Sequence, residues 1–396
     1  MMEKLAVEGG PPVRNQMLPY GRQHLDEADI AAVVEVLRSD WLTTGPMVGR
    51  FEEAFAAYVG AREAVAVSNG TAALHAAAHA LGIGPGDEVI VPALTFAASA
   101  NCVFYQGGTP VFVDVSPETL LLDPTQVEAA LTARTKAVVA VDYTGHPCAY
   151  DALQDLATRH GLALISDACH ALGGAYKGRS VGTLADLSTF SLHPVKHITT
   201  GEGGVITTDD ASLAQKMRAF RNHGLTSDHR QRAATGSWFY EMVELGYNYR
   251  LTDFQAALGI SQLQKLPQWI ARRTEIAQRY DEAFVEQPGI QPLGVRPDVV
   301  HAYHLYVVQL DLERLCADRA QVFAALRAEN IGVNVHYIPV PWHPYYQQRG
   351  YGRGHWAVAE AAYARILSLP LFPMMSDQDV EDVIVACRKV LRAHYK

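Results

Sequence analysis

The sequence predicts an α/β protein with a large domain built on a mostly parallel, seven-stranded sheet and a smaller C-terminal α+β domain. Between residues 64 and 210, short apolar runs alternate with helical segments rich in Ala and Leu. After residue 251 this alternation gives way to one long helical pattern followed by mixed short strands. Alternating strands and helices are typical of a parallel sheet with helices on its faces. The 396 residues are enough for about two domains.

The expected strands are runs rich in Val and Ile that lack in-and-out alternation, as strands covered on both faces do. They are residues 64–67, 88–91, 110–115, 137–142, 163–166, 187–191 and 204–207. Helices are expected between them at residues 71–82, 97–107, 126–133 and 151–161, and most of these end near a Gly, a common helix stop. Because ligands of such sheets bind beyond the carboxyl ends of the strands, residues that directly follow a strand are the first candidates for a site.

The boundary between the two domains is expected near residue 255, with residues 1–18 as an N-terminal arm of the large domain (1–255). The small domain (256–396) begins on a long helical pattern over residues 252–284, which Pro267 is expected to interrupt. Beyond it we expect strands at 303–310 and 333–337, a loop rich in Pro and Tyr, and a closing helix at 377–395.

Composition narrows the class of protein. The formal net charge is −9 and no long Lys/Arg run offsets it, which argues against nucleic-acid and membrane-surface partners. The five Cys are scattered without a C-x-x-C pair, which argues against a disulfide framework or a structural zinc site. Residues 89–113 carry no charge, but Pro, Gly, Asn and Gln interrupt them too often for a membrane span. With no secretion signal recognised, a cytoplasmic protein is expected.

Several common enzyme motifs are absent from the sequence. It has no G-x-G-x-x-G after a strand, no G-x-x-x-x-G-K-[ST], no H-E-x-x-H and no G-x-S-x-G. Dinucleotide-binding dehydrogenases, P-loop NTPases, zinc proteases and α/β-hydrolases are therefore disfavoured.

Lysine is scarce, and one of the eight stands apart. Lys196 lies between two apolar strands, whereas the others lie near the termini, in a turn, before a strand or on amphipathic helices. Burial lowers the pKa of a lysine and allows it to act as a Schiff-base nucleophile. Taken by itself, a lysine at this place is more often a solvated loop residue than a nucleophile.

Asp167 follows the apolar strand at 163–166. A carboxylate at such a place needs a cationic partner, and the protonated pyridine nitrogen of pyridoxal phosphate (PLP) is a partner of this kind. The alternative is that Asp167 caps a helix, because Asp commonly does so.

Two further segments follow strands. The run S-N-G-T at 68–71 opens a helix, where free backbone N–H groups and a hydroxyl can hold a phosphate, although any strand-to-helix turn can have this composition. Phe96 ends the next strand and could stack on a planar ring, or could belong to the core.

Five motifs together resemble the DegT/DnrJ/EryC1/StrS family of sugar-nucleotide aminotransferases. They are S-N-G-T-A-A-L-H (68–75), G-P-G-D-E-V-I-V-P-x-x-T-F (84–96), D-A-C-H-A-L-G (167–173), S-L-H-P-V-K-H-I-T-T-G-E-G-G (191–204) and G-Y-N-Y-R-L-T-D-F-Q-A-A-L-G (246–259). The resemblance covers nearly the whole chain. It implies a PLP-dependent transferase of fold type I, like aspartate aminotransferase, that acts as a homodimer with active sites built from both chains.

The resemblance also implies roles for individual residues. Lys196 would hold PLP covalently and move a proton during the transfer, and Asp167 would pair with the pyridine nitrogen. Phe96 would stack on the ring, and His170 would lie near its 3-hydroxyl group. The phosphate would be held by Gly70, Thr71 and Ser191, joined by Asn248 of the partner subunit.

Further residues resemble the family's contacts with the sugar nucleotide: Tyr20, Leu42, Thr43, Thr44, Gly45, His336 and Tyr337. Arg250 could reach a donor carboxylate or the nucleotide phosphates, or could brace the interface. The sequence departs from the commoner family pattern at two places. Ser68-Asn69-Gly70 stands where many members read Asn-Ser-Gly, and His170 stands where many use Gln.

Within the family, the resemblance is greatest to members that aminate C4 of a UDP-linked 4-keto-6-deoxy-N-acetylhexosamine, with L-glutamate as donor, on the route to pseudaminic acid. The features that indicate this are L-T-T-G at 42–45, D-Y-T-G at 142–145, and His170. The alternatives are an aminotransferase for another 3- or 4-keto nucleotide sugar, a non-transaminating PLP enzyme, or a regulator with the same fold. The related 3-dehydratases carry His in place of the Schiff-base lysine, so Lys196 disfavours them.

Overall fold

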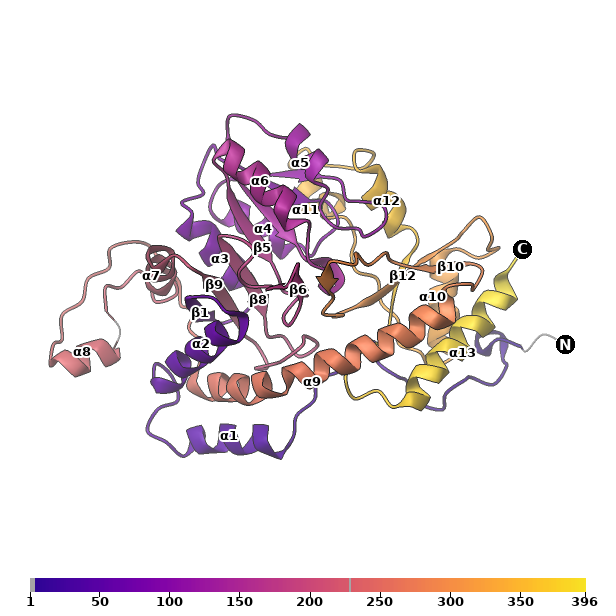
Figure 1. Cartoon of the computed structure of the whole chain (residues 1–396), viewed down its shortest axis with the longest axis horizontal. Helices are drawn as coiled ribbons and strands as arrows, with labels where there is room; N and C mark the ends of the chain where they lie inside the picture. The colour runs from indigo at the N-terminus through magenta and orange to yellow at the C-terminus, as the bar shows by residue number, and fades with distance from the viewer. Residues whose placement is uncertain (1–3, 228) are drawn as a thin grey trace.

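The computed structural model describes residues 4–227 and 229–396. Its largest sheet within these residues has seven strands in the order β1-β9-β8-β5-β4-β2-β3 (Figure 1). Strand β9 runs antiparallel to β1 and β8, and every other neighbouring pair is parallel. The strands are β1 (Glu63–Val67), β2 (Glu88–Pro92), β3 (Thr109–Val113), β4 (Thr135–Val141), β5 (Ala163–Asp167), β8 (Leu187–Ser191) and β9 (Gly204–Thr208). The predicted seven-stranded, mostly parallel sheet is confirmed.

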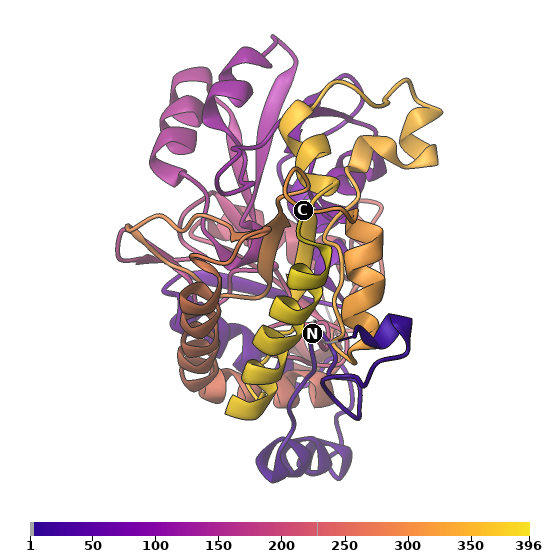
Figure 2. The ribbon, with the colours of Figure 1, turned by 90° about the vertical axis from the view of Figure 1, so that its right-hand side faces the viewer.

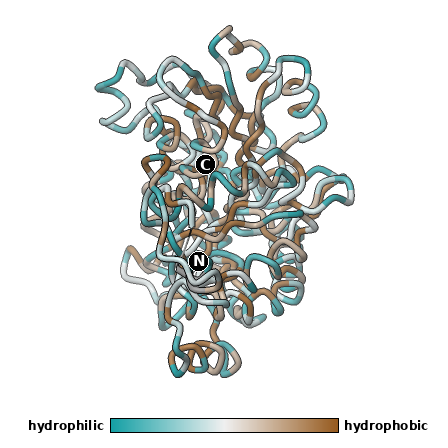
Figure 3. The backbone as a smooth tube through the Cα atoms, turned by 90° about the vertical axis from the view of Figure 1, so that its left-hand side faces the viewer, coloured by the Kyte–Doolittle hydropathy of each residue, from teal (hydrophilic) through white to brown (hydrophobic). Residues whose placement is uncertain are grey.

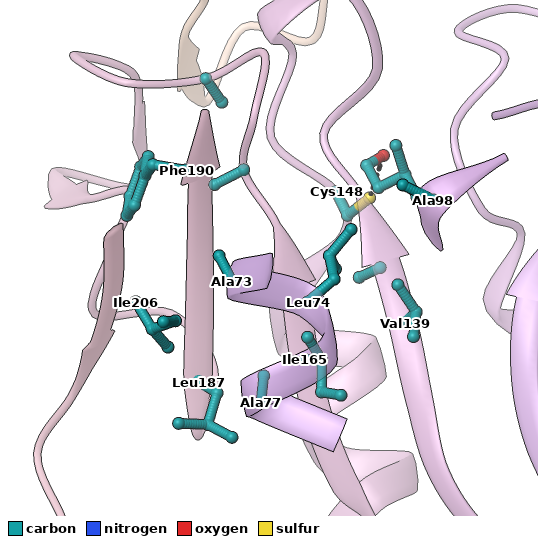
Figure 4. Close-up of a cluster of buried hydrophobic side chains, with 14 of the residues drawn as sticks. Ala73, Leu74, Ala77, Ala98, Val139, Cys148, Ile165, Leu187, Phe190 and Ile206 are labelled. Carbon is teal, nitrogen blue, oxygen red and sulfur yellow. Dashed lines mark hydrogen bonds between the residues drawn. The ribbon is translucent and has the colours of Figure 1, made fainter. Parts of the chain in front are cut away.

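The helices expected between the strands are also present: α3 (Gly70–Ala80), α4 (Ala98–Tyr105), α5 (Pro124–Ala129) and α6 (Tyr150–His160). Figure 4 shows why α3 can lie flat on the sheet. Helix α3 points the side chains of Ala73, Leu74 and Ala77 toward Ile165 of β5 and Leu187 of β8, and all of these side chains are buried. Small side chains let a helix approach a sheet closely, and this brings the beginning of α3 near the strand ends.

The long helix α9 (Asp253–Phe284) runs beneath the sheet toward the C-terminal part of the chain (Figure 1). The predicted interruption at Pro267 is wrong, because α9 continues through it. Proline in a helix removes one backbone hydrogen bond. Buried side chains on both sides of it, Leu266 and Trp269 among them, hold the helix against the core and offset this loss.

The C-terminal part of the chain contains a second sheet, in the order β10-β12-β13. Its strands are β10 (Ile290–Pro292), β12 (Tyr306–Leu310) and β13 (Ile366–Leu369). The expected strand at 333–337 is not among the described elements, because only Asn334 pairs with β13, at Ser368. After that one pair the chain leaves the sheet, and His336 and Tyr337 reach the main cavity instead.

The remaining elements complete the fold. A small sheet joins β11 (Val299–Val300), β6 (Ala175–Tyr176) and β7 (Arg179–Ser180). Single turns of 3-10 helix lie at Ala6–Glu8, Tyr143–Gly145 and Val340–Trp342. Figure 1 shows α8 standing away from the body on an extended arm. The other helices are α1 (Glu27–Leu37), α2 (Pro46–Val59), α7 (Ala211–Phe220), α8 (His229–Thr235), α10 (Arg319–Ala328), α11 (Pro344–Gln347), α12 (Ala357–Tyr363) and α13 (Asp377–His394).

Two clusters of buried apolar side chains stabilise the chain. The larger surrounds the seven-stranded sheet and also takes in Val340, Tyr346 and Trp356 from the C-terminal part. The second gathers the end of α9, α10, α13 and the sheet β10-β12-β13, together with Leu5 and Leu18. Figure 3 shows the apolar stretches running through the interior and polar stretches at the outer loops. The domain boundary near residue 255 stays a prediction.

A buried ion pair joins the N-terminal segment to the second cluster. Glu329 accepts hydrogen bonds from the backbone N–H groups of Ala6 and Val13, each at 2.9 Å. Lys389 of α13 donates to the same carboxylate at 2.9 Å and to the carbonyl of Pro11 at 2.8 Å. Glu329 thus collects three donors in a place that excludes water. In Figure 2 the N-terminal segment passes close to α10 and α13.

In the described ranges, 4–227 and 229–396, no helix has the length and apolar character needed to cross a membrane.

Replacing Glu329 with Gln is expected to lower the free energy of unfolding by about 3 kcal/mol, because it leaves the Lys389 ammonium buried without its anion. Urea denaturation followed by circular dichroism measures this loss. The matched control is Glu128→Gln, since Glu128 pairs with Arg159 at the surface, where ion pairs contribute little. Equal unfolding midpoints for the two variants would contradict the prediction.

Candidate active site

A cavity of about 650 Å³ lies at the carboxyl ends of the parallel strands. This is the edge of an α/β sheet at which ligands bind. Residues from the strand ends, from α3 and α4, and from the C-terminal part of the chain all contribute to its wall. The sequence-predicted site residues that line it are Tyr20, Gly70, Thr71, Phe96, Asp167, His170, Ser191, Lys196, His336 and Tyr337.

Lys196 lies in the loop between β8 and β9, at the wall of the cavity. The backbone N–H of Leu192 donates to the carbonyl of Gly203 and the N–H of Thr200 donates to the carbonyl of Leu192, so the loop is closed at its base. Burial lowers the pKa of the Lys196 ammonium below its ordinary value, although Cys169 and Asp167 nearby act in the opposite direction. The alternative of a solvated loop lysine does not describe this environment.

Asp167 ends β5 and is buried. Its Oδ2 accepts a hydrogen bond of 2.6 Å from Oγ of Ser99, and Ser99 is 2.8 Å from the hydroxyl of Thr95. Its Oδ1 accepts from the N–H of Cys169 at 3.3 Å. The residues after Asp167 form a turn and not an α-helix, so the alternative of a helix cap is wrong. The carboxylate is oriented by neutral donors and lines the cavity.

The beginning of α3 and Ser191 form a cradle of the kind that holds a phosphate. The side chain of Asn69 caps α3 by accepting from the N–H of Ala72 at 2.8 Å. The first amides of a helix, here those of Gly70 and Thr71, have no acceptor within the helix. A Cβ added to Gly70 would lie 2.9 Å from Cβ of Ser191. Glycine therefore lets the serine hydroxyl approach the helix N-terminus.

His170 and Phe96 border the cavity on another side. Nε2 of His170 is 3.1 Å from the hydroxyl of Tyr337, and its Nδ1 is buried with no hydrogen-bond partner among the described residues. Phe96 is 56% exposed and its ring lies 5.7 Å from that of Tyr337. The alternative that Phe96 belongs to the core is therefore wrong. Tyr20 packs on His336, with ring centres 5.4 Å apart.

The other predicted residues lie elsewhere in the single chain. Thr44, Gly45 and Arg250 line a second cavity of about 470 Å³. The segment 42–45 is held by Asp253, whose carboxylate accepts from the N–H of Gly45 at 2.7 Å and whose own N–H donates to the carbonyl of Leu42. Thr43 pairs with Thr252, and Asn248 with Asn222. One chain thus does not bring these residues to the Lys196 cavity.

Ser99 and His304, which contact Asp167 and Lys196, were not singled out from the sequence. Ser99 binds Asp167, and its signal was a hydroxyl in the first turn of the helix that follows β2. His304 lies 3.3 Å from Nζ of Lys196 and lines the same cavity. No local motif marks His304, because its contact depends on how the C-terminal part folds back.

The site offers the groups that PLP requires. One cavity is lined by the Lys196 amine, whose pKa is lowered, by the buried Asp167 carboxylate, and by the N-terminus of α3 with Ser191 beside it. By contrast, no three His, Cys, Asp or Glu side chains in the part of the chain that the structure describes are grouped so as to hold a metal ion.

Comparison with known protein families matches residues 23–388 to the DegT/DnrJ/EryC1/StrS aminotransferase family. The chain belongs to this family. As a DegT/DnrJ/EryC1/StrS member it is a PLP-dependent sugar aminotransferase of the α/β class.

Individual relatives of this family agree along nearly their whole length. The chain is 47% identical over 382 residues to the spore coat polysaccharide biosynthesis protein SpsC of Bacillus subtilis, covering 96% of this chain and 98% of that protein. The putative sugar aminotransferase Spr1654 of Streptococcus pneumoniae, in its PMP form, superposes with a TM-score of 0.90 at 33% identity, covering 95% and 99% of the two chains. Spr1654 has also been solved in a PLP form.

A third relative is PseC of Helicobacter pylori, an aminotransferase involved in pseudaminic acid biosynthesis. It superposes with a TM-score of 0.89 at 32% identity, covering 96% of this chain and 100% of PseC.

Gly70→Ala is expected to weaken PLP binding roughly tenfold, equivalent to about 1.4 kcal/mol, because the added methyl group must displace Ser191 from the cradle. Titration of the cofactor-free protein with PLP, followed by absorbance, measures the dissociation constant. Gly84→Ala is the matched control, since no atom lies within 4 Å of the position of its Cβ. A Gly70→Ala protein that binds PLP as tightly as this control would show that Gly70 is not part of the cradle.

Proposed function

We propose that this protein transfers the amino group of L-glutamate to C4 of a UDP-linked 4-keto-6-deoxy-N-acetylhexosamine, in nucleotide-sugar biosynthesis of the pseudaminic-acid type. The observation that carries the transfer chemistry is the convergence of Lys196, Asp167 and the Gly70–Ser191 cradle on one cavity. The similarity to PseC supports the choice of sugar.

Each group has a separate task in this proposal. Bound PLP supplies an electron sink for the carbon that loses a proton. Lys196 anchors the cofactor and, because its environment lowers its pKa, can hold or release a proton at Nζ. Asp167, oriented by Ser99, keeps the pyridine nitrogen protonated. Gly70, Thr71 and Ser191 hold the phosphate.

The substrate assignment rests on fewer contacts. Tyr20, His336 and Tyr337 line the main cavity and are proposed to contact the sugar nucleotide. His336 is fixed by a hydrogen bond of 2.7 Å between its Nδ1 and Oγ of Ser368. His170, through its free Nδ1, is proposed to interact with the 3-hydroxyl of PLP.

A second candidate is amination of a different 3- or 4-keto nucleotide sugar. It is favoured by the 47% identity to SpsC, whose name refers to a spore coat polysaccharide. The two candidates are separated by offering the protein a UDP-4-keto-6-deoxy-N-acetylhexosamine and other 3- or 4-keto nucleotide sugars as amino acceptors.

The absorption spectrum of the PLP-loaded protein tests donor and acceptor in turn. We expect L-glutamate to bleach the yellow lysine-bound cofactor, and a UDP-4-keto-6-deoxy-N-acetylhexosamine to restore it, as two half-reactions require. Recovery only with another keto sugar would select the second candidate. A protein that never turns yellow with PLP would contradict the proposed role of Lys196.

Lys196→Ala is expected to abolish turnover while leaving the circular dichroism spectrum unchanged, because the substitution removes the anchor and the proton carrier but lies in a loop. Lys216→Ala, on the exposed face of α7, is the matched control and should retain wild-type turnover. Substantial transamination by Lys196→Ala would contradict the assignment.

We propose further that the protein is a homodimer whose active sites contain residues of both chains. Supporting this, residues 238–247 expose a series of large apolar side chains, with Trp238 84% and Leu245 78% accessible in the single chain. An exposed segment this rich in large apolar side chains is typical of an interaction site. Asn248 and Arg250 follow this segment directly, which would bring them to the partner's cavity.

Mixing two inactive variants tests the shared site. Lys196→Ala chains and Asn248→Ala chains, unfolded and refolded together, should recover about a quarter of the wild-type activity, because half of the random dimers are hybrids with one intact site. Each variant refolded alone is the control. A mixture as inactive as the separate variants would place Asn248 and Lys196 in the site of the same chain.

A further inference from the structure

His304 approaches Lys196 from the C-terminal part of the chain. Its Nε2 is 3.3 Å from Nζ of Lys196, across a sequence separation of 108 residues. It belongs to the segment between β11 and β12, which crosses the carboxyl end of β4 before it enters the second sheet.

The backbone around His304 is held on one side by the loop that follows β4. The N–H of Ala302 donates to the carbonyl of Gly145 at 2.8 Å, and the N–H of Leu305 donates to the carbonyl of Thr144 at 3.1 Å. These bonds flank His304 in sequence and restrict where its ring can lie.

Arg273 of α9 holds the same segment on the other side. Its Nη1 donates to the carbonyl of Tyr303 at 3.0 Å, to that of Leu371 at 3.1 Å and to that of His304 at 3.4 Å. Arg273 is fully buried, and burial lowers its pKa to about 9. Placing a guanidinium in the interior is costly. The carbonyl oxygens it binds offset that cost and are themselves fixed by it.

The ring of His304 is buried. Its centre lies 4.4 Å from that of His170 and 5.6 Å from that of His197. Burial, followed by the positive charge of Lys196, lowers the pKa of His304 well below its ordinary value. While Lys196 is protonated, its ammonium can only donate hydrogen bonds, so Nε2 of His304 then accepts and Nδ1 carries the ring proton. That Nδ1 has no hydrogen-bond partner in the described part of the chain.

We propose that His304 is a positioning residue for Lys196: its Nε2 accepts a hydrogen bond from Nζ and holds the amine at one place in the cavity. The buried imidazole can accept this hydrogen bond without taking the proton, because burial disfavours the imidazolium that proton transfer would form. The inference rests on the proposed role of Lys196 as the cofactor anchor. Besides His304, the titratable groups that surround Lys196 are Asp167, Cys169, His170, His197 and His336.

The test measures the Lys196 amine directly in the full-length protein stripped of cofactor. Limited labelling with acetic anhydride over a range of pH, read residue by residue by mass spectrometry, reports the pH at which each lysine becomes reactive. In His304→Phe we expect the midpoint for Lys196 to fall by about one pH unit, because the ammonium loses its acceptor. His304→Gln, which retains an acceptor of similar reach, should stay near the wild-type midpoint. Lys216, exposed on α7, is the internal reference and should not move.

The two variants separate positioning from a purely structural role. An unchanged Lys196 midpoint in His304→Phe, or an equal fall in both variants, would overturn the inference. His304→Leu replaces His304→Phe if circular dichroism shows that the latter does not fold. The wild-type protein's colour with PLP is read in parallel. If it turns yellow while the midpoints do not move, only this inference fails, whereas a wild-type protein without colour contradicts the proposed function itself.

Discussion

One row of residues across three strands determines where the site can form. Ser191 at the end of β8 pairs with Gly204 at the start of β9, and Gly204 pairs with Val67 at the end of β1. A Cβ on Gly204 would lie 2.4 Å from the carbonyl oxygen of Asn69. Only glycine lets the turn after β1 come this close to the sheet. The beginning of α3 therefore lies beside Ser191, and the loop between β8 and β9, which carries Lys196, must return over the same edge.

The parallel pairing of β5 with β8 adds the carboxylate to this edge. Asp167, the last residue of β5, pairs with Thr189, so β8 extends two residues further to Ser191 at the same edge of the sheet. Ser99 then orients Asp167 from the first turns of α4. The polar groups of the site thus depend on backbone pairing first and on side-chain hydrogen bonds second. Burial by the surrounding protein lowers the pKa of Lys196 and makes its amine available.

The C-terminal part of the chain closes the site rather than forming a separate unit around it. The segments around His304 and His336 both reach the main cavity, one fixed through Arg273 and the other through Ser368. The residues that remain outside this cavity, Thr44 and Arg250 among them, line a second cavity close to the exposed apolar segment. The predicted site residues are thus divided between two cavities of one chain. A site completed by residues of a second chain would show this arrangement, which supports the proposed dimer.

The sequence by itself determined the seven strands, the helices between them and the edge at which the site lies. Apolar runs, glycine stops and strand-end residues are local patterns in the sequence. Because the strands are parallel, residues at their carboxyl ends lie at the same edge of the sheet, so these patterns also locate the site. The sequence also contained the motifs around Lys196, Asp167 and Gly70 that are typical of one enzyme family. Only the tertiary structure decided that α9 continues through Pro267, that residues 333–337 form a single bridge and not a strand, and that Ser99 and His304 join the site. Each of these depends on burial and hydrogen bonding between residues far apart in the chain, and such contacts leave no periodicity or spacing in the sequence.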